Sequence, residues 1–371
     1  MKYGNMINRM IVCMCMTCLA GFSVIAQDNS TTRKVEIPNT RVLQLNSAIV
    51  GQEYTLHINL PGNYSDSTKT FPVLYLLDGQ WDFPLLSALY GEQYFDGFIP
   101  GLIVVGITWG GKDPNPDQLR ARDFTPTAIS QVPKSGNAPK FLQFIKQELV
   151  PFIDSKFRTA KNDRTLTGSS LGGLFTLYAL FNETALFNRY VLTSPAVGWD
   201  NEVIYSFEKN YSVKSAQASV RLFMGIGALE PQEGFKKLAD HLEAQHYTGL
   251  TMQTRVLENT GHSGGKAEGY TRGLQFVFAK PAIKIAPGVL EKYTGAYQLN
   301  PGTNVMITSE TGKLIVHAPG GRTIELSAET ENDFYAKGIF FIVHFKKDNT
   351  GKVTGLQLDQ FGSTGFWKKE N

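Results

Sequence analysis

The sequence predicts an α/β domain built on a mostly parallel sheet, followed by a small antiparallel β domain. Continuous apolar runs such as "FPVLYLLDG" are typical of strands covered on both faces, and they alternate with helical stripes as far as about residue 279. From about residue 287 short alternating segments broken by Gly, Asn and Asp replace the helical stripes. The 371 residues, 42% of them hydrophobic and 19% charged, suit one large and one small globular domain.

The N-terminus has the pattern of a secretory signal peptide. A positive region precedes an apolar segment from Met10 to about Ile25, and small residues precede Gln27. We therefore expect residues 1–26 to be cleaved after Ala26 and the protein to be periplasmic or secreted. The alternative, a transmembrane anchor, needs roughly 20 apolar residues and a stop-transfer flank. All three cysteines lie in this leader, so we expect no disulfide and no cysteine metal ligand in the mature protein: Cys13, Cys15 and Cys18.

Charge and residue spacing exclude several function classes. The formal net charge of +3 falls to about +1 when Lys2 and Arg9 leave with the leader, so no basic field for nucleic acid remains. The six histidines show no H-x-x-x-H or similar spacing, so the sequence predicts neither a metal site nor a cofactor. We expect no membrane span after cleavage, and no feature predicts an oligomeric state.

Residues 27–280 contain the elements of the larger domain in order. Strand-like alternation to about Leu60 leads to two apolar runs that end at Leu77 and Ile107, and a long polar loop follows over residues 108–139. The segment "PKFLQFIKQELVPFIDSKF" then has helical periodicity, with one apolar stripe formed by Phe141, Phe144, Ile145 and Leu149. Strands and helices alternate from there, as in "RTLTG", "LGGLFTLYALF", "RYVLTSP", "RLFMGIG", "FKKLADHLEAQ", "TMQTRVLE" and "GYTRGLQFVFA".

Residues 287–371 are expected to form the small β domain. The preceding segment "KPAIKIAPG" has the proline and glycine content of a domain boundary. Five short alternating segments predict strands: "NVMITSE", "KLIVHAP", "RTIELSAE", "FFIVHFKK" and "VTGLQLDQ".

The stretch "TLTGSSLGG" carries the clearest chemical signal. It fits G-x-S-x-G only when centred on Ser170, since centring on Ser169 would require glycines at positions 167 and 171. A predicted strand precedes the motif and a predicted helix follows it, which is the setting of a nucleophile elbow. A glycine-rich turn with helix-capping serines is the alternative. We predict that Ser170 is a nucleophile.

A serine hydroxyl is a poor nucleophile unless a base stands beside it. Of the six histidines, only His262 follows a predicted late strand on a glycine-rich loop, which suits the chain order serine, acid, histidine. The acid should follow the preceding strand "RLFMGIG", where Glu230 lies. Glu233 and Asp240 remain alternatives, as does a weakly oriented dyad, and a carboxylate at a helix N-terminus also has a structural explanation.

The oxyanion of an ester intermediate needs preorganised N–H donors. The backbone of Leu171, directly after the candidate nucleophile, supplies one of them. In "LLDGQW", Gly79 permits an unusual backbone conformation, so the Gln80 amide is the second predicted donor. A tight turn alone would also explain Asp78-Gly79.

With these residues in place, the region from about Val42 to Ala279 resembles the Putative esterase family of α/β hydrolases. This family includes siderophore esterases, feruloyl and acetyl-xylan esterases and S-formylglutathione hydrolase. The similarity rests on "PVLYLLDG", "IVVGI", "RARDFTPT", "SGNAPKFLQFIKQELVPFID", "TLTGSSLGGLFTLYAL" and "LTSPAVGWD", and "RARDFTP" with "SGNAPKF" is most similar to the siderophore-esterase branch. The resemblance implies an α/β-hydrolase fold and the site residues named above. Ser169 departs from the histidine that many members have.

The predicted function is an exported serine carboxylic-ester hydrolase that forms an acyl-enzyme. Its partner would be a small-molecule or glycan-linked ester: a siderophore-type lactone, or a feruloyl or acetyl ester of a polysaccharide. Arginines here can instead pair with Asp117 or Asp123, and tryptophans can belong to the core. A non-catalytic binding protein on a relic hydrolase fold is the alternative from another class. The candidate substrate contacts are Trp81, Trp109, Arg120, Arg122 and Trp199.

Overall fold

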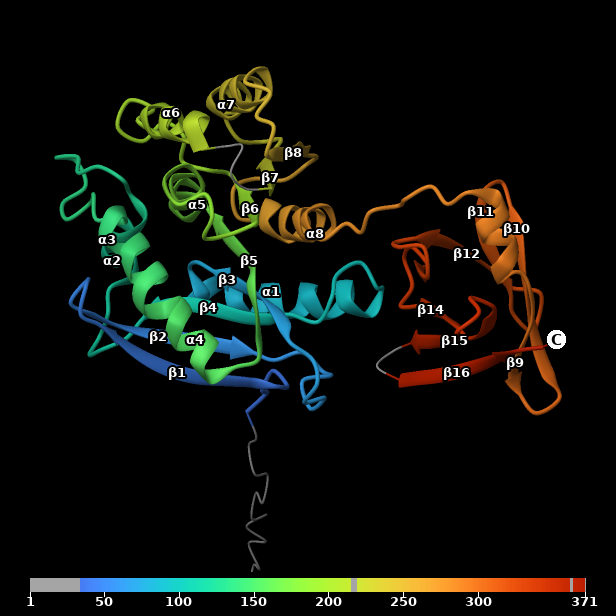
Figure 1. Cartoon of the computed structure of the whole chain (residues 1–371). Coiled ribbons are helices and arrows are strands. Elements are labelled where there is room, and N and C mark those ends of the chain that lie inside the picture. Colours follow the sequence, from blue (N-terminus) through green and yellow to red (C-terminus); the bar gives the residue numbers. More distant parts are fainter. Residues whose placement is uncertain (1–33, 215–218, 361–362, 371) are drawn as a thin grey trace, which may run out of the picture. The chain divides into compact units, whose positions relative to one another are not determined.

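The structure is a computed structural model that describes residues 34–214, 219–360 and 363–370 (Figure 1). The predicted signal peptide and its three cysteines therefore lie outside the described residues. Within the described part, no helix is long and apolar enough to cross a membrane.

An eight-stranded sheet forms the centre of the larger domain, in the order β1-β2-β4-β3-β5-β6-β7-β8. The edge strand β1 pairs antiparallel with β2, β2 pairs antiparallel with β4, and the strands from β4 across to β8 are parallel. This mixed sheet confirms the predicted α/β-hydrolase fold. The strands are β1 (Thr40–Ser47), β2 (Gln52–Asn59), β3 (Phe71–Leu76), β4 (Ile103–Trp109), β5 (Thr159–Ser169), β6 (Arg189–Thr193), β7 (Val220–Gly227) and β8 (Leu250–Leu257).

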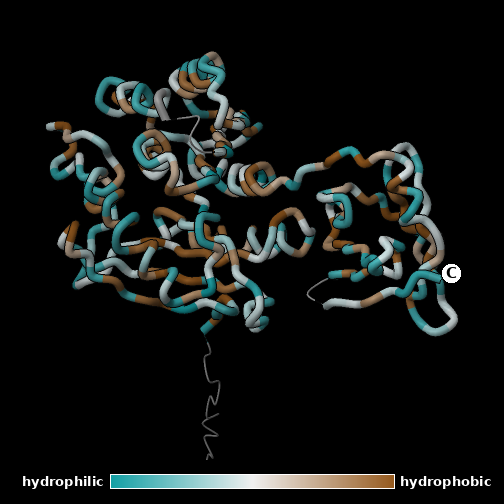
Figure 2. Tube along the Cα trace, in the orientation of Figure 1, coloured by the Kyte–Doolittle hydropathy of each residue, from teal (hydrophilic) through white to brown (hydrophobic). Residues whose placement is uncertain are grey.

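Both faces of the sheet are covered, which explains the continuous apolar runs in the sequence. Along β3, Val73 and Tyr75 belong to one hydrophobic cluster, and Leu74 and Leu76 belong to another on the opposite face. The second cluster is completed by α1 (Gly79–Phe95) and α8 (Gly265–Val277). Figure 2 shows hydrophobic residues concentrated along the strands of the sheet. The remaining helices pack on the first cluster: α2 (Pro116–Phe124), α3 (Ala138–Phe144), α4 (Val150–Lys156), α5 (Leu171–Asn182), α6 (Ile204–Lys214) and α7 (Glu233–Ala244).

The predicted helix after residue 138 contains a π-helical turn, η1 (Ile145–Leu149), between α3 and α4. The N–H of Val150 bonds to the carbonyl of Ile145, and Pro151, which lacks an N–H, follows directly. The predicted apolar stripe is fully buried. The segment predicted as a long polar loop contains α2, which starts with Asn115 as N-cap and Pro116 as its first residue.

The smaller domain is a closed barrel of eight antiparallel strands. The five predicted strands are present, and β9, β13 and β16 complete the barrel. Its interior is filled by its own apolar side chains, including Tyr293, Phe334 and Phe345. Two short helices precede it, α9 (Pro287–Leu290) and η3 (Glu291–Tyr293). The strands are β9 (Gly295–Asn300), β10 (Thr303–Glu310), β11 (Lys313–His317), β12 (Thr323–Ala328), β13 (Asp333–Tyr335), β14 (Ile342–Lys347), β15 (Val353–Gln360) and β16 (Ser363–Lys369).

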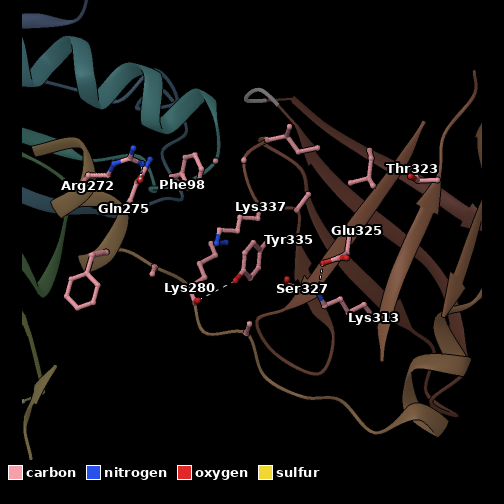
Figure 3. A pocket seen from close by; sticks show the side chains of 18 of the residues that line it. Phe98, Arg272, Gln275, Lys280, Lys313, Thr323, Glu325, Ser327, Tyr335 and Lys337 are labelled. Atoms are coloured by element: carbon pink, nitrogen blue, oxygen red, sulfur yellow. Dashed lines mark hydrogen bonds and ion pairs between the residues drawn. The ribbon is translucent and has the colours of Figure 1, made fainter. Parts of the chain in front are cut away.

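The segment that connects α8 to the barrel already contacts the barrel before residue 287. The N–H of Ile283 donates to the carbonyl of Ala328, and the Lys280 ammonium pairs with Glu329 at 2.8 Å. The hydroxyl of Tyr335 donates to the carbonyl of Lys280, as Figure 3 shows. By its contacts, this segment belongs with the barrel from Lys280 onward.

Candidate active site

Ser170 lies on a sharp turn between β5 and α5. Its backbone has φ 59° and ψ −118°, a conformation that residues other than glycine rarely adopt. The N–H of Ser170 donates to the carbonyl of Thr193, and its carbonyl accepts from the N–H of Ala196. A Cβ at Gly168 would lie 2.6 Å from the backbone of Gly172, so the turn requires glycine there. This strand, strained serine and helix have the geometry of the predicted elbow.

Ser169, the other serine of the pair, ends β5 and is 1% exposed. Its hydroxyl lies buried without a hydrogen-bond partner among the described residues. A side chain in this position is shielded from an ester substrate, which agrees with centring the motif on Ser170.

Glu230 and His262 form a close pair on the loops that follow β7 and β8. Nδ1 of His262 lies 2.6 Å from Oε2 of Glu230, whose side chain is 12% exposed. An ionised carboxylate only accepts hydrogen bonds, so Nδ1 carries a proton and Nε2 is left as the basic nitrogen. Because β5, β7 and β8 run parallel, the loop carrying Glu230, the loop carrying His262 and the Ser170 elbow share one edge of the sheet.

Several donors hold the Glu230 carboxylate. Oε1 of Glu230 accepts from the Ser194 hydroxyl at 2.6 Å and from the N–H of Gly227 at 2.9 Å. Burial raises the pKa of Glu230, but the hydrogen bonds from Ser194, His262 and Gly227 outweigh it, and the pKa lies below its ordinary value. The alternative acids, Glu233 and Asp240, are not buried in this way, because both lie exposed on α7.

The predicted oxyanion donors lie at two helix N-termini. Leu171 begins α5, and Gln80 is the second residue of α1. Asp78, the N-cap of α1, has φ 54° and ψ 39°, so the chain turns sharply before the donor. A Cβ at Gly79 would lie 2.8 Å from the backbone of Gly106, so only glycine fits between this turn and β4.

Arg120 holds this turn and is not a free cation. Its guanidinium donates to both oxygens of the Asp78 carboxylate, at 3.0 and 2.9 Å, and Asp78 is 1% exposed. The sequence predicted a substrate contact at Arg120 and missed the role of Asp78. Burial raises the pKa of Asp78, and the Arg120 guanidinium opposes that rise.

Trp109 and Arg122 were predicted to contact substrate, and the structure shows both bonded to the carboxylate of Asp123. Trp109 is 5% exposed, and its indole N–H donates to the buried Asp123 at 2.7 Å. Asp123 also accepts from Arg122 at 2.7 Å and from Tyr54 at 2.8 Å. These hydrogen bonds stabilise the Asp123 charge inside the core. Arg122 is therefore paired with Asp123, and Trp109 belongs to the core, as the alternative explanations for these residues stated.

Trp81 and Trp199 differ in exposure. Trp81 follows the predicted donor Gln80 and is 49% exposed, with the Arg120 guanidinium 5.7 Å from its ring centroid. Trp199 is half-buried against the core, and its indole N–H donates to the carbonyl of Thr127 at 3.2 Å. Of the three predicted tryptophans, Trp81 presents the most accessible ring.

A second charged network joins α1 to α8, which covers the same face of the sheet. The buried Asp82 accepts from the Lys266 ammonium at 2.8 Å and from the Tyr270 hydroxyl at 2.7 Å, so it joins α1 to α8. Burial, and then the Asp82 charge, raise the pKa of Tyr270 well above its ordinary value.

Among the residues that the structure describes, no group of three or more His, Cys, Asp or Glu side chains is placed to hold a metal ion. The pocket in Figure 3 has a volume of about 760 Å³, and none of Ser170, Glu230 and His262 lines it.

Comparison with known proteins assigns the family. The model of the Putative esterase family matches residues 47–265, more than half of the chain. The chain belongs to this family. It is therefore a serine hydrolase of the α/β-hydrolase superfamily, as the sequence resemblance implied. Residues 279–368 match a domain of unknown function, DUF3471.

Similar proteins include siderophore esterases. The chain is 26% identical to the ferri-bacillibactin esterase BesA of Bacillus subtilis, over 67% of this chain and 93% of that protein. It is 27% identical to the siderophore triacetylfusarinine C esterase of Aspergillus fumigatus, over 59% of this chain and 78% of that protein. Among solved structures, the BES protein of Bacillus cereus is similar with a TM-score of 0.62 and 27% identity, over 66% of this chain and 97% of that one. An IroE-like serine hydrolase of Shewanella oneidensis follows with a TM-score of 0.57 and 28% identity, over 64% and 80%.

Proposed function

We propose that this protein hydrolyses carboxylic esters of siderophores through an acyl-enzyme on Ser170. The observation that carries the proposal is the set of a strained serine elbow and a Glu230–His262 pair on neighbouring loops of one sheet edge. A non-catalytic binding protein that had kept only the fold would not need a strained serine elbow or a Glu230–His262 pair.

The chemistry follows from the roles that these groups can take. Nε2 of His262 accepts the Ser170 proton as the hydroxyl oxygen attacks the ester carbonyl, and Glu230 stabilises the imidazolium. The backbone N–H groups of Gln80 and Leu171 stabilise the negative oxygen of the tetrahedral intermediate. The imidazolium then protonates the leaving alcohol. Water, activated by the same base, releases the acid and restores Ser170.

The substrate class is supported by the relatives and by the surroundings of the site. Relatives named as siderophore esterases align over most of their own length. Trp81 offers an aromatic surface beside Gln80, and we propose that it packs against the acyl part of the substrate.

We also propose that the protein acts outside the cytoplasm. The support is the pattern of residues 1–26, with its positive start, apolar segment and small residues before Gln27. The intact mass of protein recovered from the periplasm or medium tests this, since cleavage would leave Gln27 as the first residue.

The function is tested by incubating purified protein with ferri-bacillibactin, triacetylfusarinine C, methyl ferulate and p-nitrophenyl acetate. We expect hydrolysis of at least one of the two siderophore esters with a higher kcat/KM than that of methyl ferulate, and no hydrolysis by Ser170→Ala. Preference for methyl ferulate would redirect the substrate class. Binding without turnover of any ester would favour the non-catalytic alternative.

A further inference from the structure

Ser194 lies between the two halves of the candidate active site. It follows β6, in the strand position between the Ser170 elbow and the Glu230 loop. It is 4% exposed, and its Oγ donates to Oε1 of Glu230 at 2.6 Å. This is a short hydrogen bond to a charged acceptor, a class that is stronger than bonds between neutral groups.

The backbone around Ser194 is tied to both catalytic loops. Its own N–H donates to the carbonyl of Gly225 in β7 at 2.7 Å. One residue earlier, Thr193 accepts the N–H of Ser170, and two residues later Ala196 donates to the carbonyl of Ser170. Ser194 has φ 45°, so the chain turns sharply at this residue. The residues on either side of it form hydrogen bonds to the Ser170 elbow.

We infer that Ser194 is a positioning residue that orients the Glu230 carboxylate toward His262. The inference rests on the proposed function and deepens it. Two donors, the Ser194 hydroxyl and the Gly227 N–H, saturate Oε1, so Oε2 is the oxygen presented to Nδ1 of His262. With one donor removed, the carboxylate can rotate about its last side-chain bond, and the imidazole, which is half exposed, loses its fixed partner.

The inference is tested by steady-state kinetics on the full chain with a p-nitrophenyl ester. Ser194→Ala should lower kcat by about 10- to 100-fold, the range for a hydrogen bond to a charged group, with KM changed by less than about 3-fold. Ser194→Gly, which also relieves the positive φ, should lose as much, because the hydroxyl is what matters. Ser206→Ala is the matched control, since that exposed hydroxyl only caps a local turn to Val203.

A double-mutant cycle separates positioning from a general packing role. In a Glu230→Gln background, Ser194→Ala should lower kcat by less than about 3-fold, because its target is already disabled. Equal losses in both backgrounds would overturn the inference, as would wild-type kcat in Ser194→Ala or Ser194→Gly. If Ser194→Ala fails to fold, judged by circular dichroism, Ser194→Gly carries the same cycle. Absence of esterase activity in the wild type would reject the proposed function itself.

Discussion

Replacing Glu230 by Gln tests the acid with almost no change in shape. Oε1 of Glu230 faces two donors, the Ser194 hydroxyl and the Gly227 N–H, so the Gln carbonyl oxygen must take that position. The Gln amide nitrogen then replaces Oε2 and points at Nδ1 of His262, 2.6 Å away in the wild type. An amide nitrogen only donates, so Nδ1 must become the acceptor and the imidazole proton moves to Nε2. In that tautomer the imidazole cannot accept the proton of Ser170.

The expected loss in kcat is on the order of 10⁴-fold, the size found when the orienting carboxylate of a serine protease becomes an amide. The assay is p-nitrophenyl ester hydrolysis across pH 5 to 9, with Glu233→Gln as the control because Glu233 is exposed on α7. Since the pKa of Glu230 lies below its ordinary value, Glu230 stays ionised throughout this range, and its own titration should not change the wild-type rate there. A larger loss in Glu233→Gln, or near-normal turnover in Glu230→Gln, would show that Glu230 is not the acid.

Three further predictions follow from the same geometry. Ser170→Ala should abolish ester hydrolysis and fluorophosphonate labelling, whereas Ser169→Ala should keep much of both; the opposite pattern would move the nucleophile to Ser169. Arg120→Met should lower the free energy of unfolding by about 3–5 kcal/mol, because it leaves the Asp78 carboxylate buried and unpaired, while the exposed Arg255→Met should change it little. The loss of unfolding free energy in Arg120→Met, measured by denaturant unfolding, should shrink as pH falls toward the ordinary pKa of Asp78. Burial raises the pKa of Asp78, and the protonated carboxyl group needs no cation. A loss that does not depend on pH would contradict this. A chain ending at Ala279 should still hydrolyse p-nitrophenyl acetate, and a folded truncation without turnover would show that the barrel completes the site.

Features that depend on neighbouring residues could be predicted from the sequence. The apolar runs gave the buried strands because both faces of the sheet are covered. The glycine spacing placed the elbow at Ser170, since a Cβ at Gly168 would meet the backbone one helical turn onward. The helix α2 was missed although Asn115 and Pro116 carry a helix-start signal, an N-cap followed by proline.

Features that depend on distant pairing could not be predicted in this way. Asp78 is 42 residues from Arg120, so neither local pattern names the other as its partner. Trp109 ends an apolar strand, and only the packing of Phe124 and the buried Asp123 reveals that it belongs to the core. The barrel closes by pairing β9 with β16 across about 70 residues of chain, which periodicity within one strand cannot indicate.

The proposed acyl-enzyme on Ser170 can be detected by trapping the intermediate. Wild-type protein is mixed with excess p-nitrophenyl acetate, quenched in acid within the first turnovers, digested and analysed by mass spectrometry. We expect an added acetyl group on the peptide that contains Ser170, located at that residue by fragmentation and absent from Ser170→Ala. An enzyme that releases product at the normal rate with no adduct, or with the adduct on Ser169 or another residue, would contradict it.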